Sequence, residues 1–224
     1  MNGAMRIVNF HGIGAAQRVL EPGEARYWLG EGRFRDMLDR IADHAERGLL
    51  RLTFDDGNIS DLAIAAPEVK GRGMQATFFV LAGRIGQPGS LSGADIRELL
   101  AMGMEIGNHG FDHVDWTSLS PRRLEQQLRC SRAAIEDVAG AAVRVAAMPF
   151  GRYNAAVIRA LSAAGYAEVY SSDGGSAAPA AFVKPRKTVV ADMSDMEVDA
   201  MLAGRLPWPR RARRWVSMTV KHAL

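Results

Sequence analysis

The stretch Leu52-Thr53-Phe54-Asp55-Asp56-Gly57 decides how this sequence is interpreted, because an apolar strand runs directly into two carboxylates and a glycine. In parallel α/β proteins, the carboxyl end of a strand is where active sites are built. Neighbouring side chains of a strand point to opposite faces, but a turn at Gly57 can bring both carboxylates into one cavity. Two carboxylates in one cavity repel each other unless a cation or a shared proton relieves them. Because Asp-Gly is also common in plain turns after a helix N-cap, the stretch alone leaves a structural role open.

Short runs of β-favouring residues lie on both sides of this stretch and alternate with segments of helical spacing. Phe34, Met37, Leu38 and Ile41, for example, are spaced as on one face of a helix. Strands that alternate with helices indicate a mainly parallel sheet, either doubly wound or closed into a barrel. The Gly, Ala and Pro content of residues 171–185 predicts a loop. The predicted strands cover residues 5–10, 49–54, 76–80, 104–107, 143–148 and 167–170.

Length and composition limit the class of protein. The 224 residues suffice for one domain, predicted over residues 1–204, followed by a basic segment, 205–224. A hydrophobic content of 48% excludes general disorder, and the lack of an apolar run of about 18–20 residues predicts no transmembrane helix. The first ten residues lack the apolar core of a secretory signal, and the single cysteine, Cys130, excludes an internal disulfide. We therefore expect a cytoplasmic protein.

A second group of chemically active residues stands in Asn108-His109-Gly110-Phe111-Asp112-His113, directly after a predicted strand. Two histidines four residues apart can converge if the loop begins a helical turn. Imidazole suits an ion such as zinc, and a carboxylate from elsewhere would complete an open three-ligand site. Such pairs also occur on solvated helix faces, so the spacing alone is weak. Combined with Asp55 and Asp56, it predicts a His/His/Asp metal site with a spare aspartate as general base.

These motifs resemble those of the polysaccharide deacetylase family, the NodB-homology domain of carbohydrate esterase family 4. The family motif T-F-D-D-G is present unaltered as Thr53 to Gly57, H-x-x-x-H is matched by His109 and His113, and a Pro-aromatic-Gly turn is matched by residues 149–151. The similarity runs from about residue 10 to about residue 186. It implies a distorted (β/α)₇ barrel and the metal-dependent N- or O-deacetylation of a sugar, with Zn²⁺ as the expected divalent metal.

The resemblance also implies roles for individual residues. Asp55 would be the general base, and the backbone N–H of Phe150, between Pro149 and Gly151, would contact the tetrahedral oxyanion. Trp116 is expected either to form an apolar wall for the acetyl methyl or the sugar face, or to be part of the core. The implied metal ligands are Asp56, His109 and His113.

Two departures from the family pattern lead to further expectations. Ala147 stands where the third motif has an arginine, and Arg186 is a candidate to supply that guanidinium near the substrate, unless it is a surface arginine. The usual C-terminal motif with a catalytic histidine is absent, and His222 lies in the basic segment. Some relatives have a permuted barrel whose acid histidine comes first. We therefore predict His11 as the general acid, the alternative being a histidine that only satisfies a loop.

Three functions remain open from sequence. The first is a deacetylase of an N-acetylated polysaccharide, oligosaccharide or lipid-linked saccharide, with a place in exopolysaccharide biosynthesis. The second is a hydrolase of a small or cyclic amide with the same metal site, and the third is a non-catalytic carbohydrate-binding protein. The aromatic content of 7% favours a short or lipid-linked saccharide over a crystalline polymer.

The basic segment 205–224 carries six basic residues and no acidic one, which leaves 22 basic and 25 acidic residues in the rest of the chain. Tryptophans and aliphatic residues alternate with these charges, which is typical of contact with an anionic membrane, here its cytoplasmic face. A final barrel helix with solvated arginines is the alternative. Nucleic acid is not expected as a partner, because the rest of the chain is mildly acidic and carries no recognition motif.

Overall fold

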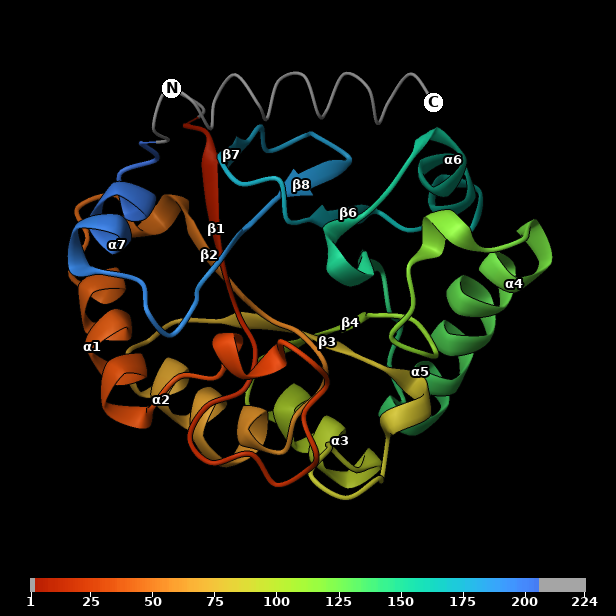
Figure 1. The fold of residues 1–224 in the computed structure, drawn as a ribbon, viewed down its shortest axis with the longest axis horizontal. Helices are drawn as coiled ribbons and strands as arrows, with labels where there is room; N and C mark the ends of the chain where they lie inside the picture. The colour runs from red at the N-terminus through yellow and green to blue at the C-terminus, as the bar shows by residue number, and fades with distance from the viewer. Residues whose placement is uncertain (1–2, 206–224) are drawn as a thin grey trace.

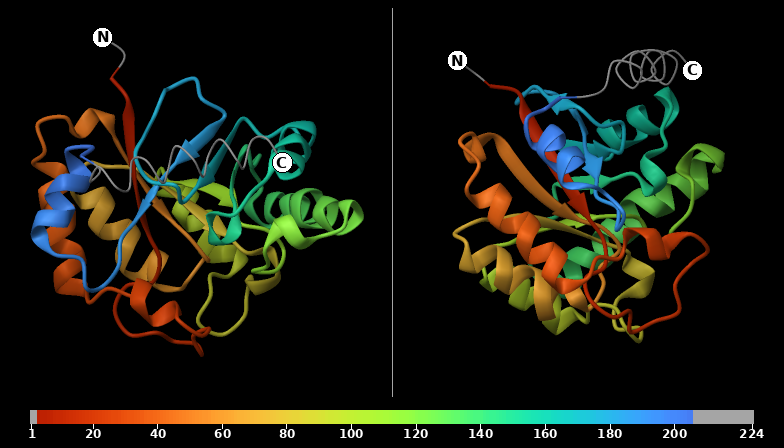
Figure 2. Two further views of the ribbon diagram at one scale, coloured as in Figure 1. Left: turned by 45° about the horizontal axis from the view of Figure 1, so that its top comes forward. Right: turned by 60° about the vertical axis from the view of Figure 1, so that its left-hand side comes forward.

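Nine strands form one curved sheet in the computed structural model, which describes residues 3–205. The strand order is β7-β1-β2-β3-β4-β5-β6-β8, and β9 also pairs with β1. Strands β1 to β6 are parallel to their neighbours, whereas β7 is antiparallel to β1. Figures 1 and 2 show the helices outside this sheet. The strands are β1 (Met5–Phe10), β2 (Leu50–Phe54), β3 (Ala76–Val80), β4 (Glu105–Asn108), β5 (Val145–Ala147), β6 (Glu168–Ser171), β7 (Ser176–Ala177), β8 (Val183–Pro185) and β9 (Lys187–Thr188).

The sheet comes close to closing into a barrel through residues 183–188. Strand β8 pairs in parallel with β6, and β9 pairs in parallel with β1, although only Arg186 separates β8 from β9. One short stretch of chain therefore joins the two edges of the sheet. Strands β8 and β9 together act as one strand that is split at Arg186. With β1 to β6, they make the seven strand positions of a distorted (β/α)₇ barrel, so the predicted fold class is confirmed.

The helices form where the sequence provides caps and apolar faces. Helix α1 buries the four predicted residues Phe34, Met37, Leu38 and Ile41 against the sheet. The Asn154 side chain accepts a hydrogen bond from the Val157 N–H, which caps α6. The helices are α1 (Glu31–Ala42), α2 (Ala66–Gly71), α3 (Gly93–Ala101), α4 (Pro121–Glu125), α5 (Ser131–Ala139), α6 (Ala155–Ala163) and α7 (Asp195–Leu202).

Stacked phenylalanines fix the first strands relative to one another. The rings of Phe10 and Phe54 lie 5.3 Å apart on β1 and β2, and Phe54 lies 4.7 Å from Phe78 on β3. Phe34 of α1 meets Phe10 edge to face at 5.3 Å. Each ring is fully buried, and burying such a side chain contributes about 1.5–3 kcal/mol to the stability of the fold. This core holds the ends of β1 and β2, from which His11, Asp55 and Asp56 project, in a fixed position.

Two sequence expectations need comment. The loop predicted for residues 171–185 is wrong in part, because β7 and β8 lie within it. The expected helix or membrane contact of the basic segment 205–224 falls, apart from Arg205, outside the described residues. Within residues 3–205, no helix has the length and apolar character needed to cross a bilayer.

Candidate active site and metal centre

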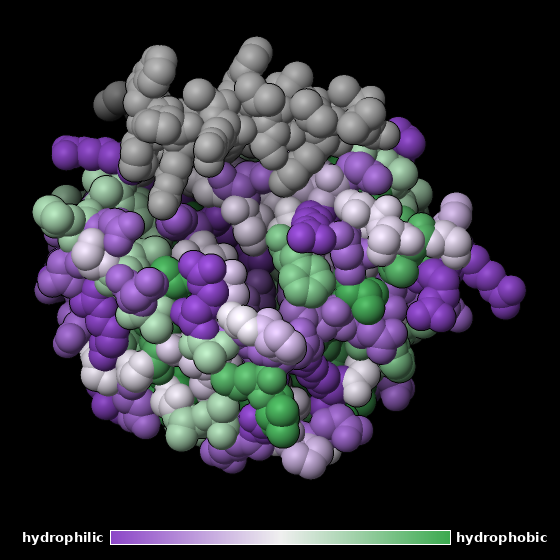
Figure 3. Space-filling model, in the orientation of Figure 1, coloured by the Kyte–Doolittle hydropathy of each residue, from purple (hydrophilic) through white to green (hydrophobic). Residues whose placement is uncertain are grey.

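Polar side chains from several strand ends meet at one end of the barrel. His11 follows β1, Asp55 and Asp56 follow β2, His109 follows β4, and Phe150 lies three residues beyond β5. They line a cleft of about 530 Å³, a size typical of ligand sites. The cleft opens between the short helices η1 (Glu24–Tyr27) and η7 (Pro149–Gly151), where the space-filling view is hollowed (Figure 3). Parallel strands thus place the candidate residues at one edge, as the sequence predicted.

Asp55 is a buried carboxylate held on both oxygens. Arg186 donates to Oδ1 at 2.7 Å and to Oδ2 at 2.9 Å, and the Asn9 amide donates to Oδ2 at 2.9 Å. Burial alone would raise the pKa of Asp55, but the Arg186 guanidinium, with His109 and His11, holds it well below its usual value. Asp55 is therefore ionised and fixed in orientation, with 3% of its surface exposed.

Asp56 turns away from Asp55 because the backbone leaves the strand at this residue. Its φ of 81° lies in the left-handed region, which aspartate tolerates better than most residues, and Gly57 continues the turn with φ 64°. The Oδ1 atom of Asp56 is buried and accepts no hydrogen bond among the described residues. Burial opposes ionisation, but the nearby His11, His109 and His113 lower the pKa of Asp56. The tight turn thus aims one unpartnered oxygen into the cleft.

The two histidines present the same ring nitrogen to this oxygen. Nδ1 of His109 lies 2.9 Å from the carbonyl oxygen of Ala147, and Nε2 lies 3.6 Å from Asp56 Oδ1. Nδ1 of His113 lies 3.0 Å from Glu21 Oε2, and Nε2 lies 3.9 Å from Asp56 Oδ1. Carbonyl and carboxylate oxygens only accept hydrogen bonds, so each Nδ1 carries the proton and each Nε2 offers a lone pair. Burial lowers the pKa of His109, which favours its neutral form.

The loop that carries the histidines differs from the expected helical turn. Residues 109–113 form a bend, with Gly110 at φ 101°. The Gln127 side chain, on the helical segment after α4, accepts hydrogen bonds from the N–H groups of Phe111 and Asp112 at 2.8 and 3.0 Å. These bonds hold the loop so that the rings of His109 and His113 lie 5.6 Å apart. The side chains converge without the helix.

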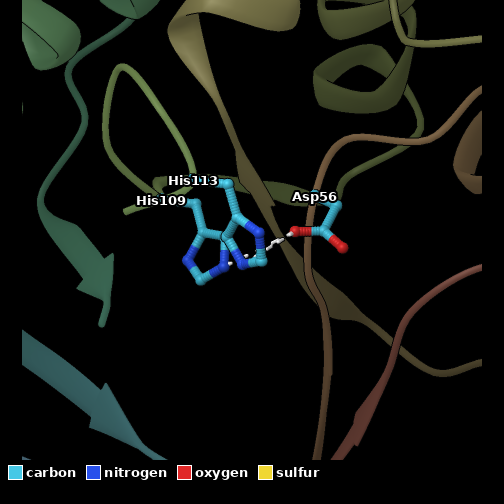
Figure 4. Close-up of side chains that lie close together, drawn as sticks. All are labelled: Asp56, His109 and His113. Atoms are coloured by element: carbon cyan, nitrogen blue, oxygen red, sulfur yellow. Dashed lines mark ion pairs between the residues drawn. The ribbon is translucent and has the colours of Figure 1, made fainter. Parts of the chain in front are cut away.

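Asp56, His109 and His113 fit a divalent metal such as zinc. One ligand atom from each lies within 4.8 Å of the others, and Figure 4 shows the three side chains converging. A tetrahedral zinc with bonds of about 2.0–2.1 Å separates its ligands by roughly 3.3 Å, so only small shifts are needed. The unpartnered buried oxygen of Asp56 and the two free Nε2 atoms are the donor set expected of a zinc site with an open position. Among the described residues, no other such cluster of three is found.

His11 lies next to Asp55, directly after the end of β1. Its Nε2 atom is 4.0 Å from Asp55 Oδ2, and its ring stacks on Tyr27 at 4.9 Å. The side chain is 15% exposed and lines the cleft, so the ring can reach a bound molecule. Its Nδ1 atom is buried without a hydrogen-bond partner among residues 3–205. Among the described residues, no hydrogen bond of this nitrogen ties the ring to its loop.

The predicted Pro-aromatic-Gly turn is present and strained at its centre. Phe150 has φ 57°, its ring is 52% exposed, and it lies 4.4 Å from the His113 ring. Phe150 and Gly151 line the cleft, whereas Pro149 is buried behind it. A Cβ on Gly151 would meet Ser172 at 2.4 Å, so only glycine fits there. The turn thus places an exposed ring beside His113.

Trp116 and Arg186 were candidates to contact the substrate, but neither side chain lines the cleft. Trp116 is 1% exposed within a separate core cluster and does not line the cleft, so the expected apolar wall is wrong and the core alternative holds. Arg186 is completely buried, so it is neither a surface arginine nor open to an oxyanion. Its guanidinium is instead committed to Asp55, as described above. Arg186 therefore holds the Asp55 carboxylate and does not line the cleft.

Sequence reasoning missed three residues that organise the site. Asn9 bonds Asp55, and the Thr53 hydroxyl donates to Asn9 Oδ1 at 2.6 Å across the β1–β2 register. The signal for Asn9 was its place on the predicted strand two residues before His11, since alternate residues of an extended chain share a face. Gln127 and Glu21 come from distant segments, and no local pattern marks them.

Comparison with known proteins agrees with this arrangement. The family described as "Polysaccharide deacetylase" matches residues 42–169, more than half of the chain. The Bacillus subtilis protein YxkH, assigned to the polysaccharide deacetylases, is 28% identical over 141 residues, which are 63% of this chain and 50% of YxkH. The chain spans half or less of the length of the curated relatives that it matches.

Solved structures with the same fold include PplD and IcaB. The Streptococcus pyogenes deacetylase PplD, in complex with acetate, superimposes with a TM-score of 0.76 at 22% identity, covering 92% of this chain and 100% of PplD. IcaB from Ammonifex degensii gives 0.70 at 22% identity, covering 89% of this chain and 96% of IcaB. At this identity, the structures show a shared fold. Together with the family match, they establish that the chain belongs to the polysaccharide deacetylase family of hydrolases.

Proposed function

We propose that this chain is a metal-dependent deacetylase that hydrolyses the acetamide of an N-acetylated sugar and releases acetate. The observation that carries this proposal is the unpartnered, buried Oδ1 of Asp56 facing Nε2 of His109 and His113, beside an ionised Asp55. Three ligands for a metal and one separate carboxylate base are what the hydrolysis of an unactivated amide needs.

The residues divide the chemistry between them. A divalent ion, proposed to be Zn²⁺ and held by Asp56, His109 and His113, would polarise the acetyl carbonyl and acidify water. Asp55 accepts the proton of the attacking water, and its two bonds to Arg186 keep the receiving oxygen in place. The backbone N–H of Phe150 is proposed to stabilise the developing oxyanion.

His11 is proposed to donate a proton to the departing amine, because it lines the cleft and its Nε2 atom lies 4.0 Å from Asp55 Oδ2. Replacing His11 with alanine should therefore slow hydrolysis of an acetamide about 10²–10⁴-fold, but should slow hydrolysis of an activated aryl acetate much less. The aryl oxide leaves without a proton. The ratio of the two kcat/KM losses is the measurement, and equal losses would mean that His11 is structural.

The cleft favours a saccharide over a small cyclic amide. Besides the catalytic groups, it is lined by the half-buried Tyr27 and the exposed ring of Phe150, which offer flat apolar faces. Its volume of about 530 Å³ and its open mouth leave room for more than one acetylated unit. We propose a short or lipid-linked saccharide as substrate, with a role in exopolysaccharide biosynthesis.

Acetate release from N-acetylated oligosaccharides of increasing length tests this proposal, with allantoin-like cyclic amides assayed in parallel. We expect acetate from the saccharides and no turnover of the cyclic amides. Turnover of the cyclic amides alone would favour the small-amide hydrolase. Saccharide binding without acetate release from the zinc-loaded protein would favour the non-catalytic carbohydrate-binding protein.

For residues 205–224 we propose contact with an anionic membrane, on the sequence pattern of basic and apolar residues alone. The full chain should then sediment with vesicles containing phosphatidylserine, less so at high salt, whereas a chain ending at Gly204 should not. Neutral vesicles are the control. A full chain that ignores anionic vesicles, or a shortened chain that fails to fold, would contradict the membrane contact.

A further inference from the structure

Glu21 lies against the metal-facing imidazole of His113 although it is 92 residues away in sequence. Its Oε2 atom is 3.0 Å from Nδ1, while Nε2 of the same ring is 3.9 Å from Asp56 Oδ1. Because an ionised carboxylate can only accept, this contact places the ring proton on Nδ1 and leaves the Nε2 lone pair for a metal. We propose that Glu21 is a positioning residue that fixes the tautomer and orientation of His113 and strengthens it as a metal ligand.

The two metal-binding histidines are supported differently. His109 is held by the neutral backbone carbonyl of Ala147, whereas His113 is held by a charged side chain. A carboxylate polarises the ring more than a carbonyl does and raises its basicity as a ligand. His109 is also the more buried of the two, at 2% against 17% side-chain exposure. The more exposed ligand therefore receives the stronger partner.

Glu21 reaches the site on a segment that is closed at its base. We call residues 13–29 the strap. Gly14 N–H donates to the Leu29 carbonyl at 2.8 Å, and Leu29 N–H donates to the Gly12 carbonyl at 3.0 Å. A Cβ on Gly12 would lie 2.2 Å from the Trp28 ring, so the two ends of the strap pack without space between them. The strap is thus a loop whose two ends are held together by hydrogen bonds and packing.

The middle of the strap is fastened to the loop that follows Asp56. Arg18 forms an ion pair with Glu24 within the strap, and its Nε donates to Asn58 Oδ1 at 3.0 Å. The Glu21 N–H donates to Glu24 Oε2 at 2.8 Å, which sets the backbone of Glu21 itself. Asn58 lies two residues after Asp56. The strap therefore connects two ligands, Asp56 through its loop and His113 through Glu21.

The second oxygen of Glu21 forms an ion pair with Arg84, the last residue of the short helix η4 (Ala82–Arg84) that follows β3. The Glu21 side chain is 41% exposed, and ion pairs at such sites contribute little to stability. The pair therefore does not account for the fold of the strap. The contact with His113 is the one with a chemical consequence. Strap residues Pro22, Gly23 and Tyr27 also line the cleft, so this segment forms part of its wall.

This inference rests on the proposed metal site, and zinc affinity tests it without any substrate. We expect Glu21→Ala to weaken zinc binding about 10–100-fold in a competition titration with a chelating dye, and Glu21→Gln, which keeps an uncharged acceptor, to fall between. Arg84→Ala is the matched control, because it removes the ion pair and leaves the contact with His113; its zinc affinity should stay near that of the wild type.

A second readout separates positioning from a structural role. In the zinc-loaded protein labelled with ¹⁵N-histidine, Glu21→Ala should move the Nδ1–H resonance of His113 and leave that of His109 in place. The melting temperature of the zinc-free variant should match that of Arg84→Ala. Unchanged zinc affinity in Glu21→Ala, or an equal loss in Arg84→Ala, would overturn the inference while leaving the metal site intact. A wild-type protein that takes up no zinc would overturn the proposed metal site and this inference with it.

Discussion

The Asp55→Asn variant should bind zinc and yet lose acetate release by about 10²–10⁴-fold, because the amide cannot accept a proton from water. The three proposed ligands are untouched, since Asp55 contacts Arg186 and Asn9 and not the metal-facing nitrogens. Zinc content and kcat/KM on an N-acetylated oligosaccharide are the two measurements. Near-wild-type turnover in this variant would show that another group is the base.

Folding must be checked in this variant, because Arg186 loses its charged partner in a fully buried position. Removing one partner of a buried ion pair lowers the free energy of unfolding by about 3–5 kcal/mol. The activity of the variant should therefore be measured below its melting temperature. Asp61→Asn is the matched control. Burial, with the charges of Asp56 and Asp55, raises the pKa of Asp61 well above its usual value, which favours the neutral carboxyl that asparagine resembles. Activity should be retained there.

Removing a ligand should have a different signature. We expect zinc and activity to be lost together in each of three variants, Asp56→Asn, His109→Ala and His113→Ala. The loss of zinc affinity should exceed the roughly 10–100-fold loss that follows when only a hydrogen-bond partner of a ligand is removed. The reason is that two remaining donors cannot hold the ion in an open site. Zinc affinity by competition and acetate release should fall in parallel across the three variants.

His44→Ala is the control for this series, since His44 does not line the cleft and its Nδ1 accepts a hydrogen bond from the N–H of Glu46. It should keep both zinc and activity. Full zinc occupancy in His109→Ala would mean that the ion is bound elsewhere.

Much of the site could be predicted because strand ends are marked locally. The apolar runs before His11, Asp55 and His109 predicted strands, and the rule for parallel sheets placed their ends together. The stacking of Phe10 on Phe54 shows why this worked, since the core fixes neighbouring strands in register.

The contacts between distant segments could not be predicted. The bond from Arg186 to Asp55 depends on β8 and β9 joining both edges of the sheet, and these strands of three and two residues lie in or next to a stretch that resembles a loop. The burial of Trp116 depends on the packing of α4 and α6 around it, which no periodicity reveals. Glu21 has no motif, because its role comes from the path of the strap.

The most direct test of a zinc-dependent deacetylase is a titration of the metal-free wild-type chain with zinc, with acetate release from an N-acetylated oligosaccharide measured at each point. The site of Asp56, His109 and His113 predicts no acetate without zinc and a rise that ends at one zinc per chain. Acetate release that is the same with and without zinc would contradict this account, as would zinc-loaded protein that releases none.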